Sequence, residues 1–138
     1  MSVRVNERNQ GDLTVIVKAK ELSLHTIKVT QNENYFPKRY RLTFTDKMVA
    51  KSIDIFTLLL EANELYPHNL QEYQTRQAYQ RKAMAYCRSL AAMLDIAKEL
   101  FNLPTKKVEY WIKLIFSVRN LTAAWYNKDR QRFEDKFN

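Results

Sequence analysis

The sequence predicts an all-α protein built as an antiparallel, up-down-up-down four-helix bundle. The 138-residue chain contains one Gly and three Pro, whereas proteins built from sheets need many Gly-rich turns. Apolar residues recur at spacings of three and four along four long stretches, which is the period of a helix face. Only short segments separate these stretches, so consecutive helices are expected to run antiparallel. A chain of this length fits one domain that buries roughly two thirds of its unfolded surface.

The first helix is predicted to begin after a flexible N-terminal arm, residues 1–11, which is polar and lacks a helical apolar period. Asp12 suits an N-cap, and the helix is expected to run to about Asn32. Its predicted apolar face consists of Leu13, Ile16, Val17, Leu24 and Ile27. His25 adjoins that face and has no second His or Cys at ligand spacing, so we expect a packed or half-exposed histidine rather than a metal ligand.

The second helix is predicted to begin between residues 38 and 44 and to end before Pro67. Pro37 biases Phe36 away from helical angles, and Thr43-x-x-Asp46 resembles a capping box with Asp in place of Glu. The face expected to be buried consists of Val49, Ile53, Phe56 and Leu60.

The third helix is predicted to span about Gln71 to Asn102, with one unbroken stripe formed by Ala83, Cys87, Leu90, Leu94, Ala97 and Phe101. Cys87 lies in that stripe, so we interpret it as a small core residue rather than a reactive thiol. A second apolar line repeats every seven residues on another face and is predicted to form a subunit contact: Tyr79, Tyr86, Met93 and Leu100.

The fourth helix is predicted to begin with Thr105 as N-cap and to run to about Asn127. Its main stripe consists of Trp111, Leu114, Val118, Leu121 and Trp125. The bundle domain would therefore span residues 12–127. Residues 128–138 alternate charges with phenylalanines, and we expect a charged C-terminal tail or a frayed helix there.

The charge balance favours polyanionic partners, because 23 Lys and Arg face 15 Asp and Glu, a formal net charge of +8. In an antiparallel bundle, the first linker and the third linker meet at one end, where cations outnumber acids. The residues predicted to bind phosphates are Lys38, Arg39, Arg41 and Lys51 at that end, with Arg76, Arg81, Lys82 and Arg88 on the third helix.

Part of this positive charge is expected to be neutralised by ion pairs between the second and third helices. The cations that begin the second helix can face Asp95 and Glu99 on the third, and Glu61 and Glu64 can face Arg76 and Arg81. Two aromatic residues in the same region stay open to two interpretations: Tyr35 and Tyr40 either stack on unpaired bases or pack in the turn.

Other classes of function find little support in the sequence. The single cysteine allows no internal disulfide, and we find no signal peptide and no apolar run near 18 residues, so a cytoplasmic protein without a membrane role is expected. Only His25 and His68 are near-neutral bases, and no catalytic triad order, metal-ligand spacing or Gly-rich phosphate loop occurs. We therefore expect neither catalysis nor a cofactor or metal.

Several short motifs resemble one known family. They are Lys20-Glu21-Leu22, then Phe36-Pro37-Lys38-Arg39-Tyr40-Arg41, Asp46-Lys47, Asp54-Ile55 and Glu61-Ala62-Asn63. This pattern, over roughly residues 13–127, resembles the accessory variability determinant (Avd) proteins of diversity-generating retroelements, which are similar to bundle proteins encoded within bacterial 23S rRNA intervening sequences. The intervening-sequence branch typically ends the second helix with an Ala-Glu-Gly-like motif, so Glu61-Ala62-Asn63 favours the retroelement branch.

The resemblance implies a homopentameric, barrel-like assembly of antiparallel four-helix protomers in a bacterial or phage setting. It implies binding to RNA or DNA and to a reverse transcriptase, in support of mutagenic copying of a template RNA, and no catalysis by the accessory protein itself. The alternative is a structural adaptor whose cations pair with acids on a protein partner, without direct contact to nucleic acid.

Overall fold

The computed structural model describes residues 10–137 as an all-helical fold, with no strand in that range. In chain order the elements are α1 (Gln10–Thr30), a 3-10 turn η2 (Lys38–Tyr40), a π-helical turn η3 (Arg41–Thr45), α2 (Asp46–Glu64), α3 (Leu70–Phe101) and α4 (Thr105–Phe137). Because α1 already includes Gln10, Asp12 lies inside the helix, and its predicted N-cap role is wrong. The predicted arm falls mainly on residues 1–9, which lie outside the described residues.

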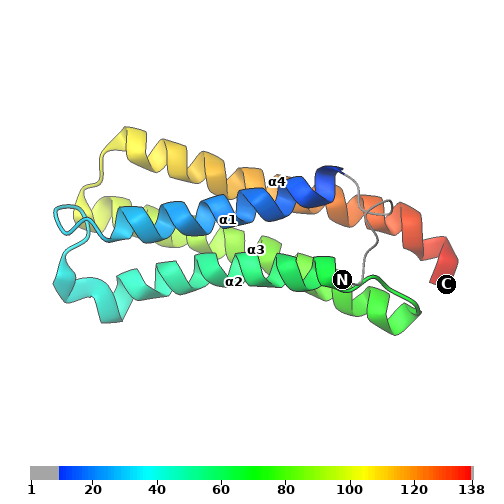
Figure 1. The fold of residues 1–138 in the computed structure, drawn as a ribbon. Helices are drawn as coiled ribbons and strands as arrows, with labels where there is room; N and C mark the ends of the chain where they lie inside the picture. The colour runs from blue at the N-terminus through cyan, green and yellow to red at the C-terminus, as the bar shows by residue number, and fades with distance from the viewer. Residues whose placement is uncertain (1–9, 138) are drawn as a thin grey trace.

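The four long helices form a bundle in which α1 packs on α2 and α4, and α3 packs on α2 and α4 (Figure 1). The link between α1 and α2 and the link between α3 and α4 lie at the same end of the bundle in Figure 1, and the link between α2 and α3 lies at the other. Ring contacts agree, since Phe36 in the first link lies 5.3 Å from Phe101 and 6.0 Å from Trp111. The prediction of an all-α four-helix bundle is confirmed.

The buried face of α1 is not the face that the sequence predicts. Val17 and Leu24, from the predicted stripe, are 62% and 46% exposed, whereas Ile16 and Ile27 are half-buried. The core side instead consists of Val15, Ala19, Leu22, Ser23, Thr26 and Thr30.

The two threonine hydroxyls on this core side each find a hydrogen-bond partner. Thr26 Oγ1 donates to the Leu22 carbonyl at 2.9 Å, and Thr30 Oγ1 donates to the Thr26 carbonyl at 2.7 Å. Thr26 also accepts a 3.1 Å hydrogen bond from Trp111 Nε1 of α4. Buried polar atoms with partners avoid the desolvation penalty of unpaired ones.

The same inversion occurs in α2. Ile53 and Leu60 of the predicted stripe are exposed, and Val49 and Phe56 are half-buried. The side that faces the core contains Met48, Ser52, Ile55, Leu59, Ala62 and Asn63. The core sides of α1 and α2 combine large and small residues, and the apolar rows that the sequence predicts lie on the outer, more exposed sides.

The entry to α2 is an irregular helical segment rather than a capped helix start. Helical structure begins at Lys38, within the predicted interval, but it passes through η2 and η3 before the regular α-helix begins at Asp46. No side chain caps α2, because its preceding residue, Thr45, is itself helical. The predicted Thr43–Asp46 capping box is therefore wrong.

α3 and α4 begin within one residue of the predicted starts, but Thr105 is the first helical residue of α4, so its predicted N-cap role is wrong. Asn69 Oδ1 accepts from the Glu72 backbone at 2.9 Å, and Glu72 Oε1 accepts from the His68 backbone at 2.8 Å, so reciprocal hydrogen bonds cap α3. Its predicted core stripe is buried except for the half-buried Phe101, and the main stripe of α4 is buried except for the half-buried Leu121.

Residues 128–137 are not a separate tail. α4 continues without a break to Phe137, and Asp129 and Phe133 in this extension are fully buried. Phe133 lies 5.5 Å from the Tyr66 ring and 5.6 Å from the Tyr73 ring. The extension therefore packs on the end of α2 and the start of α3, and the bundle domain includes it.

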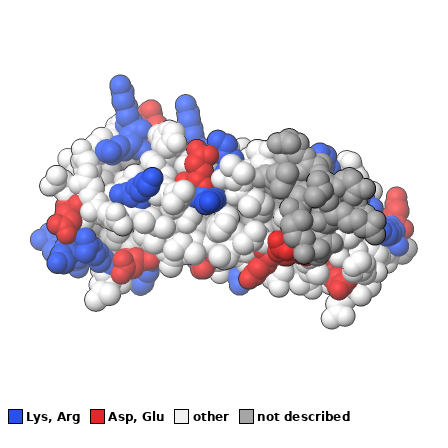
Figure 2. Space-filling view, viewed as in Figure 1, with Lys and Arg blue, Asp and Glu red and all other residues white. Residues whose placement is uncertain are grey.

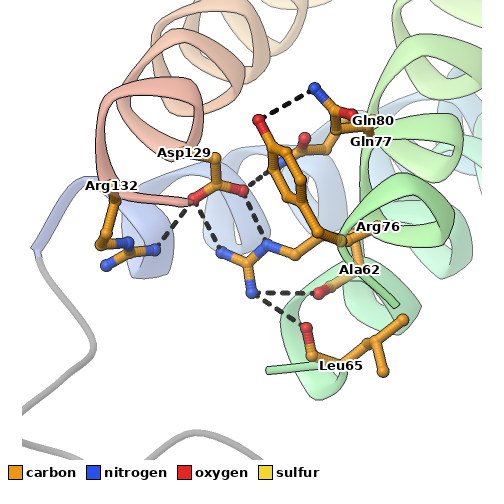
Figure 3. A network of polar contacts seen from close by, with 8 residues as sticks. Ala62, Leu65, Arg76, Gln77, Gln80, Asp129 and Arg132 are labelled. Carbon is orange, nitrogen blue, oxygen red and sulfur yellow. Dashed lines mark hydrogen bonds and ion pairs between the residues drawn. The ribbon is translucent and has the colours of Figure 1, made fainter. Parts of the chain in front are cut away.

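A buried charge cluster holds this end together (Figure 3). Arg76 of α3 and Asp129 of α4 are 1% and 0% exposed, and two guanidinium nitrogens donate to the carboxylate at 2.7 and 3.1 Å. The third nitrogen donates to the carbonyl of Leu65 at 3.1 Å and lies 3.4 Å from that of Ala62. Gln80 and Arg132 also donate to Asp129, both at 2.9 Å. We call these residues the Arg76 cluster: Arg76, Gln80, Asp129 and Arg132.

The Arg76 cluster joins three helices through one guanidinium. It satisfies free carbonyl groups at the end of α2, which carry the negative end of that helix dipole. A bidentate Arg–carboxylate pair with further donors is the geometry that offsets the cost of burying two charges.

We predict that Asp129→Ala lowers the free energy of unfolding by about 3–5 kcal/mol, because it leaves Arg76 buried and uncompensated. The double variant Arg76→Met with Asp129→Leu should recover part of that loss, since it also removes the fully buried charge of Arg76 and leaves only the partly exposed Arg132 without the carboxylate of Asp129. Urea unfolding followed by circular dichroism measures both. An Asp129→Ala protein as stable as wild type would contradict this account of the cluster.

Candidate nucleic-acid interface

One end of the bundle carries a concentration of exposed cations. We call it the basic end, and its exposed lysines and arginines are Lys38, Arg39, Lys47, Lys98, Lys106 and Lys107. They come from η2, the start of α2, the end of α3 and the start of α4. Figure 2 shows Lys and Arg side chains at the end of the molecule that carries the first and third links, with Asp and Glu side chains among them.

A cluster of aromatic rings supports the basic end. Phe36 is fully buried beneath the first link. The rings of Tyr40 and Phe44 lie edge-on to Phe101, with centroids 5.1 and 5.9 Å away. These contacts fix η2 and η3 against the end of α3, so Lys38 and Arg39 project from a packed base.

The rings of Tyr35 and Tyr40 pack in the turn, which is the second of the two interpretations that the sequence left open. Both are half-buried. The Lys107 ammonium lies 5.3 Å from the centroid of Tyr35, and the Arg39 guanidinium lies 5.1 Å from that of Tyr40. These distances suit cation–π contacts, which orient the two cations at the surface.

Pairing between α2 and α3 does not neutralise the basic end. Among the described residues, the one ion pair formed by the predicted cations at this end joins Arg41 to Glu33 at 3.1 Å, within the first link. The expected pairs with Asp95 and Glu99 do not form. Lys51 instead lies half-buried over the Tyr86 ring of α3, 3.8 Å from its centroid.

The cations predicted on α3 divide into two groups. Arg81, Lys82 and Arg88 are exposed. Arg81 lies within 3.3 Å of the Tyr126 hydroxyl, and Lys82 lies 5.7 Å from the Tyr86 ring. Neither Arg81 nor Arg76 pairs with Glu61 or Glu64 in the described part of the chain.

Arg76 does not belong to this surface. Its guanidinium is fully used inside the Arg76 cluster, so the prediction that it binds phosphate is corrected. The sequence offered no sign of this, because its partner Asp129 lies 53 residues away.

The second apolar line of α3 is largely covered within the chain. Tyr79, Tyr86 and Met93 are half-buried against the core, and only Leu100 is exposed. More exposed apolar side chains occur elsewhere, and among them is Tyr110 on α4. The sequence signal for Tyr110 is its position between Lys106 and Lys113, four residues after one and three before the other.

His25 is half-buried between α1 and α4, and its ring lies 4.9 Å from Tyr110 and 5.6 Å from Trp111. Burial, and then the charge of Lys107, lower the pKa of this imidazole. No group of His, Cys, Asp and Glu residues suited to a metal ion occurs among residues 10–137.

Cys87 lies in the core, as predicted, and burial raises the pKa of its thiol to about 12.

Comparisons with protein-family models, with curated proteins and with solved structures find no match to this chain. Within the described range, no helix is both long enough and apolar enough to cross a lipid bilayer.

We predict that Cys87 does not react with Ellman's reagent in the native protein at pH 8, because the thiolate is the reacting species and burial disfavours it. Unfolding in guanidinium chloride should release one rapidly reacting thiol per chain. Fast reaction of the folded protein would contradict the assignment of Cys87 to the core.

Proposed function

We propose that this chain is a non-enzymatic accessory protein that binds the phosphates of RNA or DNA through its basic end. The observation that carries the proposal is that these cations have no carboxylate partner among the described residues. Lys38, Arg39, Lys47 and Lys106 are exposed and pair with no carboxylate among the described residues. Cations with free donors, gathered at one end, suit contact with successive phosphates and no particular base sequence.

The position of the cations adds to this argument. Lys47 is exposed in the first turn of α2, where the helix dipole disfavours positive charge by about 0.3–1 kcal/mol per exposed residue. Since acids of α3 do not offset that cost, a polyanionic partner is a physical reason for the arrangement.

The exposed apolar side chains support an assembly of several copies. Val17 and Leu24 on α1 are seven residues apart, as are Ile53 and Leu60 on α2, so each pair lies on one helix face. Ile27 continues the apolar row of α1 and Val49 that of α2. These two residues line a common pocket, so the two rows lie on the same side of the α1–α2 pair. We call the two rows together the α1–α2 strip: Val17, Leu24, Ile27, Val49, Ile53 and Leu60.

Other exposed apolar side chains lie on α3 and α4, namely Ile96, Leu100 and Phe116. The α1–α2 strip of one copy can pair head to tail with the α3 and α4 side chains of the next copy. Repeated contacts of this kind generate a ring when the rotation between copies closes. We therefore propose a ring of antiparallel four-helix protomers. The number five, the reverse transcriptase partner and the role in retroelement copying, within the cytoplasm, rest on the resemblance of the motifs around Phe36-Pro37.

We predict that the double variant Lys38→Gln with Arg39→Gln weakens binding to RNA and DNA of mixed sequence by similar factors. It should also reduce the slope of log affinity against log salt by about 1 for each residue removed. Fluorescence anisotropy of labelled oligonucleotides measures both quantities.

The matched control is Arg130→Gln with Lys136→Gln, which removes the same charge from two exposed residues near the end of α4. It should change the slope much less. Equal losses in the two double variants would contradict a localised site. Wild-type protein that binds an acidic protein partner but no oligonucleotide would favour the adaptor alternative.

We predict by light scattering a particle of five times the 16.5 kDa chain mass. Leu24→Lys with Ile53→Lys should yield a helical monomer, because both side chains are exposed in the single chain and are covered only in the assembly. Leu42→Lys, in the highly exposed position of η3, serves as the control and should leave the mass unchanged. A wild-type monomer at all concentrations would contradict the ring.

A further inference from the structure

Tyr110 is a large aromatic side chain that the fold holds at the surface. It is 52% exposed, whereas its neighbour Trp111 is 1% exposed and donates to Thr26 of α1. The His25 ring meets Tyr110 edge to face, at 4.9 Å and an interplanar angle of 66°. The buried Trp111 thus fixes the register of α4 against α1, and His25 supports the base of the exposed ring.

Lysines surround this ring. Lys106 and Lys113 lie four residues before and three residues after Tyr110, which puts all three on one face of α4. The two lysines are about 10 Å apart along the helix axis, with the ring between them. The pKa of the His25 imidazole is lowered first by burial and second by the positive charge of Lys107. Lys107 therefore adds positive charge on the side of Tyr110 that contacts His25.

The lysines outnumber the unpaired acids nearby. Glu21 of α1 is paired with Lys18 at 3.3 Å, and Glu109 is exposed and forms no ion pair with a described residue, so three lysines face one unpaired carboxylate. Lys106 and Lys113 are exposed and have no carboxylate partner in the described range. We call this surface the Tyr110 patch: His25, Lys106, Lys107, Tyr110 and Lys113.

We propose that the Tyr110 patch binds single-stranded nucleic acid, with one unpaired base stacked on Tyr110 and the flanking phosphates on Lys106 and Lys113. The inference rests on the proposed function and specifies the strand state of its ligand. Only an unpaired base presents its flat face to a surface ring, since the bases of a duplex are stacked inside it. A second copy of the chain is a poorer occupant for the same face, because the α1–α2 strip, the surface proposed to meet a neighbouring copy, is apolar and contains no acid to pair with these lysines.

The test is fluorescence anisotropy of labelled oligothymidylate, oligouridylate and a duplex, with the full chain at low salt. Tyr110→Leu keeps an apolar side chain against His25 but removes the stacking face. It should weaken single-strand binding by about 5- to 150-fold, the range for loss of one stacked base. Duplex binding should not change. Tyr110→Trp, which restores a larger aromatic face, should bind single strands as tightly as wild type or more tightly.

Three results would overturn the inference. Equal weakening of single-strand and duplex binding would assign Tyr110 to general packing, and unchanged single-strand binding would remove it from the site. A change in particle mass by light scattering, with Tyr110→Leu still fully helical, would make the patch a contact between copies. Failure of wild-type protein to bind any oligonucleotide would refute the proposed function itself, which is a distinguishable outcome.

Discussion

The buried pair of Arg76 and Asp129 is the interaction on which the far end of the bundle depends. One guanidinium joins the carboxyl end of α2, the first turns of α3 and the extension of α4. Without a partner, either charge would be costly to bury. The pair therefore accounts for the helical packing of residues 128–137, and it removes the most central α3 cation from any role in binding. The uncompensated charge of the molecule is left at the surface, above all at the basic end.

Much of the fold could be predicted because α3 and α4 bury their largest apolar side chains in regular stripes. In α1 and α2 the buried side is not the row that the apolar period selects. Their core sides mix large residues such as Leu22 and Leu59 with small ones such as Ala19 and Ser52, and the predicted rows become the α1–α2 strip. Periodicity alone locates an apolar row but does not say whether the chain itself or another molecule covers it. The exposed cations Lys38 and Arg39 followed from sequence, while the burial of Arg76 depended on a distant partner.

The basic end and the Tyr110 patch adjoin through Lys106 and Lys107. The aromatic cluster around Phe101 holds the turn that carries Lys38 and Arg39, and the contacts of Trp111 and His25 hold the ring of Tyr110. Both surfaces thus place cations on packed aromatic supports, which limits the entropy lost when a ligand binds. Such preorganised charge suits a partner recognised by its phosphates, with unpaired bases contributing where a ring is available.

The most direct test of this account is the affinity of the wild-type protein for an oligonucleotide as a function of salt concentration. Four phosphate contacts, from Lys38, Arg39, Lys47 and Lys106, predict that affinity falls about 50- to 150-fold between 50 and 200 mM salt. The fall should be similar for different base sequences of the same strand state. An affinity that does not change with salt would contradict the central claim that uncompensated cations bind the backbone.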